Sequence, residues 1–269
     1  MAQNITVGVR VRPLSQLEKG HGAWECIVCQ EGSQINVNDP DDKVCRCHPS
    51  RARCARPAPR TSPLSGLLSP PQMGGIDYLR LDKTKDKSYA FDHVYDHKNS
   101  QEDVFDGTAK QLIPEIMRGA NATCFAYGAT GSGKTYTMMG SSDNPGVVLL
   151  TTDHLFDAIV KREEEDSIVV QAQYVEIYNE QIRDLIEPEH DHLDVREAPG
   201  KGTFVAGAAI VNVTSRRELE GYIHKGNMYR TTEATNVNEV SSRSHAVLQL
   251  RVLSTHRFEE KATTKARLL

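Results

Sequence analysis

The sequence has 269 residues, of which 38% are hydrophobic and 25% are charged, as is typical of a globular protein with an apolar core. The net charge of −4 excludes a general attraction to nucleic acid, so an acidic partner would have to meet local basic patches. No apolar run is long enough for a transmembrane helix, and residues 1–6 lack the features of a secretory signal. We therefore expect an intracellular protein with no membrane or nucleic acid partner, whose six cysteines are reduced thiols.

The N-terminal third predicts short strands and one long insert. An alternation of apolar and polar residues predicts a strand over Ile5–Val11, which Pro13 ends. Residues 43–74 are rich in proline and arginine and have no apolar period, which predicts a disordered insert. The further strand candidates are Trp24–Val28, Gln34–Val37 and Ser88–Tyr95.

Cysteines in this region raise the alternative of a zinc site. Cys26 and Cys29 lie in a strand-like segment, where positions i and i+3 point to opposite faces. The other candidate ligands, Cys45, Cys47, His48 and Cys54, lie in or beside the insert. We therefore favour thiols without a metal over a zinc site.

Helices and strands alternate in the rest of the chain. Ser100 and Asp103 predict a capping box for a helix that runs to about Met117, with Pro114 kinking or breaking it. Thr152 is expected to cap a second helix. Ser215 with Glu218 predicts a third helix, and strands are expected at Ser167–Ile177, Leu193–Val195, Thr203–Val213, Ala246–Leu253 and Ala262–Leu269. The mixture predicts an α/β layer fold.

The most informative stretch carries the pattern G-x-x-x-x-G-K-[ST], formed here by Gly128, Gly133, Lys134 and Thr135. The apolar run Ala122–Tyr127 before it predicts a buried strand, and the residues after it can continue as a helix. Glycines in such a loop let backbone N–H groups surround phosphate oxygens. We expect phosphates to be held by Gly128, Ala129, Thr130, Gly131, Ser132, Gly133, Lys134 and Thr135. In this arrangement Lys134 reaches the β- and γ-phosphates, and the Thr135 hydroxyl holds Mg²⁺.

A second polar stretch, Asn238–His245, has the sequence N-E-V-S-S-R-S-H. Together with the first pattern it resembles the switch I loop and the phosphate loop of the kinesin motor domain. Further matches are Arg10-Val-Arg12-Pro13, Tyr89-Ala-Phe91-Asp92 and Tyr174–Glu180, so the resemblance covers residues 4–39 and 76–269. Gly140–Gly146 and Ala246–Gln249 are most similar to the kinesin-8 group.

The resemblance implies the kinesin motor fold, a mainly β-sheet centre flanked by helices, with ATP and Mg²⁺ as ligands. It implies that Arg10, Arg12 and Pro13 line the adenine side and that Tyr136 lies near the base. It implies that Ser242 approaches Mg²⁺, that Ser241 places the attacking water, and that Arg243 pairs with a glutamate of switch II. Asn238 belongs to the same catalytic loop.

In the family, switch II follows within a few residues of Leu269, where this sequence ends, so we expect a partial motor domain over 1–269. The implied function is ATP hydrolysis coupled to movement along microtubules in the cytoplasm, with homodimerisation through a stalk outside these residues. Arg196 and Lys201 are candidate tubulin contacts, or equally solvated charges. The alternatives are a fragment that binds nucleotide without hydrolysis or motility, and an incomplete gene model.

Overall fold

The computed structural model of the chain describes residues 5–30, 33–38, 87–162, 164, 166–189, 192–199, 202–234, 244–256 and 264–268. The predicted insert at 43–74 lies outside these ranges and stays a prediction, as do the zinc candidates Cys45, Cys47, His48 and Cys54. The chain forms two compact units, residues 14–94 and residues 1–13 with 95–269.

The unit of residues 14–94 contains a small antiparallel sheet. Its strands, in the order β2-β3-β4, are Ile27–Gln30, Gln34–Val37 and Lys87–Ala90, and the short helix α1 is Gln16–Gly20. Cys29 lies opposite Ile35 in the β2–β3 ladder, which confirms that this region is extended. The expected strand at Ser88–Tyr95 is instead two strands, β4 and β5 (His93–Tyr95). Among the described residues, no group of three or more His, Cys, Asp or Glu could hold a metal ion.

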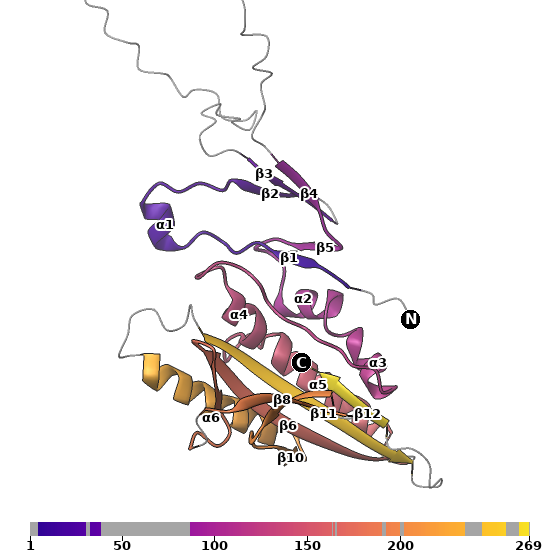
Figure 1. Cartoon of the computed structure of the whole chain (residues 1–269). Coiled ribbons are helices and arrows are strands. Elements are labelled where there is room, and N and C mark those ends of the chain that lie inside the picture. Colours follow the sequence, from indigo (N-terminus) through magenta and orange to yellow (C-terminus); the bar gives the residue numbers. More distant parts are fainter. Residues whose placement is uncertain are drawn as a thin grey trace, which may run out of the picture. The chain divides into compact units, whose positions relative to one another are not determined.

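The larger unit is built on an antiparallel sheet whose path is β10-β6-β11-β12 (Figure 1). Its members are β6 (Asp166–Tyr178), β7 (Gln181–Asp184), β10 (Val211–Val213), β11 (Ser244–His256) and β12 (Thr264–Leu268). The longest ladder pairs β6 with β11 from Ser244 opposite Tyr178 to His256 opposite Asp166. Strand β7 folds back on β6 through Asn179 and Glu180, whose φ values of 49° and 63° suit a tight two-residue hairpin.

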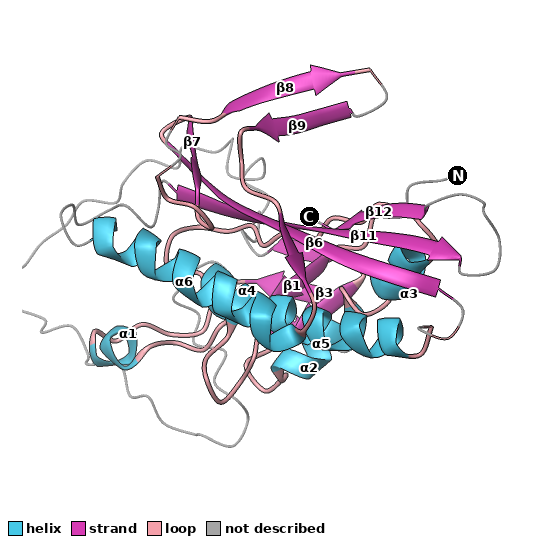
Figure 2. Ribbon diagram, turned by 90° about the horizontal axis from the view of Figure 1, so that it is seen from below, coloured by secondary structure: helices cyan, strands magenta, loops and turns pink. Residues whose placement is uncertain are grey.

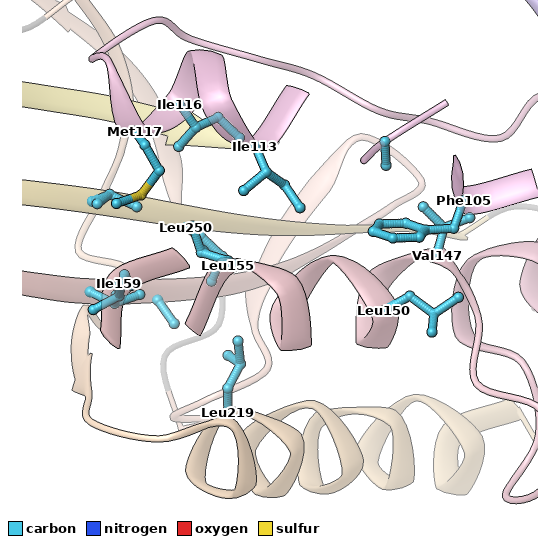
Figure 3. Packing of buried hydrophobic residues seen from close by; sticks show 14 of the residues in the cluster. Phe105, Ile113, Ile116, Met117, Val147, Leu150, Leu155, Ile159, Leu219 and Leu250 are labelled. Atoms are coloured by element: carbon cyan, nitrogen blue, oxygen red, sulfur yellow. The ribbon is translucent and has the colours of Figure 1, made fainter. Parts of the chain in front are cut away.

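The helices of this unit are α2 (Gln101–Gly107), α3 (Leu112–Met117), α4 (Lys134–Met139), α5 (Val147–Val160) and α6 (Arg216–Ala234). Helix α5 contacts both α3 and α6. Figure 3 shows Leu219 of α6 pointing toward α5, and Phe105 of α2 beside Val147 at the start of α5. These side chains belong to one core with the inward face of the sheet, including Leu250.

Close backbone approach fixes how α6 lies on the sheet. A Cβ on Gly226 would come within 2.7 Å of the Tyr174 ring and 3.0 Å of the Leu185 Cβ. The Tyr174 hydroxyl donates to the Asn227 side chain at 2.7 Å. The buried carboxylate of Asp184 accepts from the backbone N–H groups of Ile186 and Ala209, at 2.8 and 2.6 Å, which fixes the chain after β7.

Three short strands also belong to this unit. Strand β1 (Gly8–Arg10) is the core of the expected strand at Ile5–Val11, and the Val11 N–H donates to the Tyr95 carbonyl at 2.8 Å. Strands β8 (Asp194–Ala198) and β9 (Gly202–Ala206) form a hairpin that extends away from the helices (Figure 2). No helix within the described ranges is long and apolar enough to cross a membrane.

The predicted helical end at Met117 is confirmed, but one predicted helix break and one predicted helix start are misplaced. The helix that begins after Ser100 has the predicted capping box, but it ends at Gly107, and α3 begins again at Leu112. The break therefore precedes Pro114, which lies in the first turn of α3, where a missing N–H costs nothing. Thr152 does not cap α5, because the helix already begins at Val147 and the Thr152 hydroxyl donates to the Val148 carbonyl.

The expected buried strand at Ala122–Tyr127 is also wrong. Apart from a single bridge at Ala122, this stretch forms no strand, and Phe125 and Tyr127 are 78% and 95% exposed. Its side chains alternate between exposed and half-buried, so the backbone is extended as predicted. A strand also needs ladder partners on its N–H and C=O groups, and these come from distant segments that a local pattern cannot reveal.

Candidate functional site: a phosphate-binding loop

The phosphate loop, defined here as Gly128–Thr135, joins the extended stretch to α4. Gly131 and Gly133 have φ values of 77° and 97°, in the left-handed region that residues with a Cβ rarely adopt. A Cβ on Gly128 would come within 2.6 Å of the Ser132 hydroxyl oxygen. The backbone conformation therefore favours glycine at 131 and 133, and the close Ser132 side chain favours it at 128.

Lys134 lies across the phosphate loop. Its Nζ donates to the carbonyl oxygens of Gly128 at 2.9 Å and of Ala129 at 3.0 Å. The Ser132 N–H donates to the Ala129 carbonyl at 3.1 Å, which closes the turn from inside. The ammonium group is thus held at the loop itself, where it can balance the charge of an anion.

Thr135 lies in the first turn of α4, directly after Gly133 and Lys134. N–H groups in the first turn of a helix have no intrahelical acceptor, so they are available to an anion. A triphosphate with a divalent cation requires backbone N–H groups and a positive charge near the phosphates, and an oxygen ligand for the metal. The left-handed glycines, the Lys134 ammonium and the Thr135 hydroxyl can supply these. The residues present therefore fit the nucleotide and the Mg²⁺ that the motif implies.

A group of side chains that we call the base-side cluster borders the loop helix: Arg10, Gln101, Tyr136 and Thr137. Arg10 Nη1 donates to Gln101 Oε1 at 2.7 Å and to Thr137 Oγ1 at 3.2 Å. The Arg10 guanidinium carbon lies 5.1 Å from the centroid of the Tyr136 ring. The structure thus brings together Arg10 and Tyr136, two residues that the sequence could link only through a family resemblance.

The other expected base-side residues lie in the segment that follows β1. Arg12 and Pro13 are both exposed, and Arg12 Nη1 donates to the Pro13 carbonyl at 3.0 Å. Gln101 was missed by the sequence analysis, although it is only 3% exposed. The capping box at Ser100 and Asp103 located the helix start next to it, but a single glutamine carries no signal by itself.

The four expected catalytic residues, Asn238, Ser241, Ser242 and Arg243, lie outside the described residues. The elements before and after them are joined by a group that we call the Arg230 cluster: Glu176, Arg230 and Ser244. Arg230 Nε lies 3.1 Å from Glu176 Oε1, and Arg230 Nη2 donates to the Ser244 hydroxyl at 2.9 Å. The Ser244 hydroxyl donates to Glu176 Oε1 at 2.6 Å, so the cluster ties α6 to β6 and to the start of β11.

The sequence analysis did not find the Arg230 cluster. A usable signal was present, since Glu176 lies between the apolar residues Val175 and Ile177 near the end of a strand, where a buried carboxylate needs a partner. The residue that would satisfy it is far away in the sequence, so only the fold reveals the pairing.

Burial shapes the chemistry of the stretch before the loop. The side chain of Cys124 faces the core, in contrast to its neighbour Phe125, and burial raises the pKa of the Cys124 thiol. The thiol therefore stays protonated at neutral pH and is a packing group rather than a nucleophile.

The candidate tubulin contact Arg196 is exposed and lies 3.3 Å from Asp194, while Lys201 is outside the described residues.

A family model of the kinesin motor domain matches residues 10–269, nearly the whole chain. The chain belongs to the kinesin motor-domain family. This assignment confirms the family that the paired motifs predicted, and with it the kinesin motor fold. A solved structure titled "Structure of a fast kinesin: Implications for ATPase mechanism and interactions with microtubules" is similar, with a TM-score of 0.77 and 29% identity. The match covers 99% of this chain and 64% of that one.

Curated kinesins are similar at the sequence level. "Kinesin-like protein KIF19" of Homo sapiens is 37% identical over 93% of this chain, and "Kinesin-like protein KIN-8B" of Arabidopsis thaliana is 35% identical over 92%. These relatives agree with the expected similarity to the kinesin-8 group. The chain spans 22% of the human relative and 26% of the plant relative, so it corresponds to a limited part of their length.

Proposed function

We propose that this chain is the nucleotide-binding part of an ATP-driven microtubule motor that works on the cytoplasmic cytoskeleton. The observation that carries the proposal is the phosphate loop, with Lys134 Nζ held by two of the loop's own carbonyls. Membership of the kinesin family supports ATP rather than another nucleotide, and microtubules rather than another track. A stalk outside these residues would make the full-length protein a homodimer.

Each part of the loop has a distinct role in this proposal. The backbone N–H groups from Gly128 to Gly133 surround the phosphate oxygens, and Lys134 leaves its loop carbonyls to contact the β- and γ-phosphates. Thr135 supplies a hydroxyl ligand to Mg²⁺, with Ser242 as its expected partner. A bound Mg²⁺ neutralises charge on the phosphates and so favours attack at phosphorus.

The remaining expected residues complete the reaction. Ser241 places the attacking water, Arg243 pairs with a glutamate of switch II, and Asn238 belongs to the same loop. On the opposite side, Arg10, Arg12 and Pro13 line the adenine pocket beside Tyr136. Catalysis in this proposal rests on positioning and charge stabilisation, because phosphoryl transfer needs little covalent chemistry from the protein.

The test is nucleotide binding and turnover by the chain and by Lys134→Ala. We expect the variant to lose at least about thirtyfold in Mg-ATP affinity, because a charged hydrogen-bond partner of the phosphates is removed. Fluorescence titration with a labelled ATP analogue measures the affinity, and phosphate release by the full-length protein, with and without microtubules, measures turnover. Lys110→Ala is the matched control, since Lys110 forms an exposed pair with Asp106.

Equal affinity in Lys134→Ala and the unchanged chain would contradict the role of the loop. Binding without any phosphate release, at saturating microtubules, would favour the alternative of a nucleotide-binding module without motor activity. Release that microtubules accelerate, and that Lys134→Ala abolishes, is the outcome expected for a motor.

A further inference from the structure

Gln101 is the buried centre of the base-side cluster. It is the first residue of α2, where the capping box of Ser100 and Asp103 fixes the backbone, and it is 3% exposed. Its side chain touches two parts of the molecule that are distant in sequence, β1 and α4. A polar side chain at this depth has to be satisfied by hydrogen bonds, and both ends of this amide are.

The chemistry of its partners fixes the orientation of the Gln101 amide. Oε1 accepts from Arg10 Nη1 at 2.7 Å, and a guanidinium has only donors. Nε2 donates to the Tyr136 carbonyl at 2.8 Å, and a carbonyl only accepts. A flipped amide would place donor against donor and acceptor against acceptor. Among residues of this length, only glutamine joins a donor-only cation to an acceptor-only carbonyl.

The consequence is a fixed position for Arg10. Besides Gln101, its Nη1 has Thr137 Oγ1 at 3.2 Å, and the guanidinium lies against the face of the Tyr136 ring. Without Gln101, the long and flexible Arg10 side chain would be held only by the weaker hydrogen bond to Thr137 and by the contact with the Tyr136 ring. Tyr136 itself is 47% exposed, so part of its ring is open to a ligand.

We propose that Gln101 is a positioning residue for the base side of the nucleotide site, acting through Arg10 and Tyr136. The inference rests on the proposed function, because it takes Arg10 and Tyr136 as the residues beside the base. It also assigns the binding of the phosphates and the binding of the base to different parts of the site. The phosphate loop binds the phosphates without Gln101, while binding of the base depends on the buried Gln101 amide at the start of α2.

The test compares two ligands, Mg-ATP and Mg-tripolyphosphate, by isothermal titration calorimetry. Gln101→Leu keeps the approximate volume but removes both hydrogen bonds. We expect it to lower the affinity for ATP about tenfold, as a lost hydrogen bond to a charged group does, and to change that for tripolyphosphate less than about twofold. Gln111→Leu is the control, since Gln111 is exposed and bonds only to the Gly107 carbonyl of its own helix region.

Gln101→Glu separates the two contacts and covers the case in which the leucine variant fails to fold. A carboxylate keeps the acceptor for Arg10 but faces the Tyr136 carbonyl without a donor. We therefore expect a selective loss of ATP affinity that is smaller than in Gln101→Leu. An equal loss for both ligands, in either variant, would mean a general distortion of the loop and would overturn the proposal.

A double variant tests whether Gln101 acts through Arg10. If it does, Arg10→Ala with Gln101→Leu loses no more ATP affinity than Arg10→Ala alone. Additive losses would overturn the proposed route through Arg10. If the unchanged chain binds tripolyphosphate but both Gln101 variants bind ATP at full affinity, only the positioning role fails. If the unchanged chain binds neither ligand, the proposed function itself fails, and the positioning role with it.

Discussion

Strand β6 and the stretch Ala122–Tyr127 are both extended and rich in apolar residues, but they differ in what surrounds them. Strand β6 pairs along its whole length with β11, and Val170, Ala172 and Tyr174 on it are at most 4% exposed. In the stretch before the phosphate loop, Tyr127 is 95% exposed. A tyrosine is thus part of the core on β6 but contacts solvent in Ala122–Tyr127.

The difference shows that the apolar side chains of an extended segment become buried only when neighbouring strands pair with it and a helix packs on its face. Strand β6 has β11 on one edge, β10 and β7 on the other, and α6 on its face. Stability should therefore be concentrated around β6, while the proposed phosphate contacts lie directly after Ala122–Tyr127. Three pairs of variants test whether stability is concentrated around β6.

The largest effect should come from two tyrosines in the two regions. Tyr174→Ala removes a 4% exposed ring and its hydrogen bond to Asn227, and we expect it to lower the free energy of unfolding by about 4 kcal/mol. Tyr127→Ala should change it by less than about 0.5 kcal/mol. Urea denaturation followed by circular dichroism measures both. Comparable losses in the two variants would mean that Ala122–Tyr127 is as well packed as β6.

The Arg230 cluster should give the second effect. Arg230→Ala leaves the Glu176 carboxylate, whose side chain is 8% exposed, without its cation, at an expected cost of about 3 kcal/mol. Arg196→Ala breaks the exposed pair with Asp194 and should cost less than about 1 kcal/mol. The same denaturation assay compares them. A cost for Arg230→Ala no greater than that of the control would show that the cluster contributes nothing to stability.

The smallest effect should come from two glycines of the same helix. Gly226→Ala places a methyl group against the Tyr174 ring and should destabilise by about 1–2 kcal/mol, despite the better helix propensity of alanine. Gly221→Ala meets no atom within 4 Å and should stabilise by about 0.5–1 kcal/mol. Thermal unfolding gives the sign for each. If both variants were stabilised, α6 would lie farther from β6 than the structure places it.

Much of the loop could be predicted from the sequence because its chemistry is local. The spacing of Gly128, Gly133, Lys134 and Thr135 implies a phosphate loop, and the left-handed backbone at Gly131 and Gly133 agrees. The capping box at Ser100 was also readable, as was the Ser215 hydroxyl that accepts from the Glu218 N–H, because a capping side chain and the N–H that donates to it lie within one helical turn.

Most of the features that the sequence missed depend on distant partners. The pairing of Glu176 with Arg230 spans 54 residues, and that of Arg10 with Gln101 spans 91. The absence of a ladder at Ala122–Tyr127 is of the same kind, because strand formation is decided by neighbours in the sheet. The helix starting at Val147 was misplaced for a different reason: Gly146, rather than a side-chain cap, begins it.

The junction between α4 and α5 links the loop to the hydrophobic core. A Cβ on Gly140 would overlap the Asn144 carbonyl, and one on Gly146 would come within 2.6 Å of the Met138 carbonyl, while the Gly146 N–H donates to Met139 O at 3.0 Å. Helix α4 therefore cannot slide without displacing α5, whose Leu155 is fully buried. The proposed phosphate site is thereby connected to the hydrophobic core, and we expect a cavity opened around Leu155 to weaken phosphate binding although Leu155 does not touch the loop.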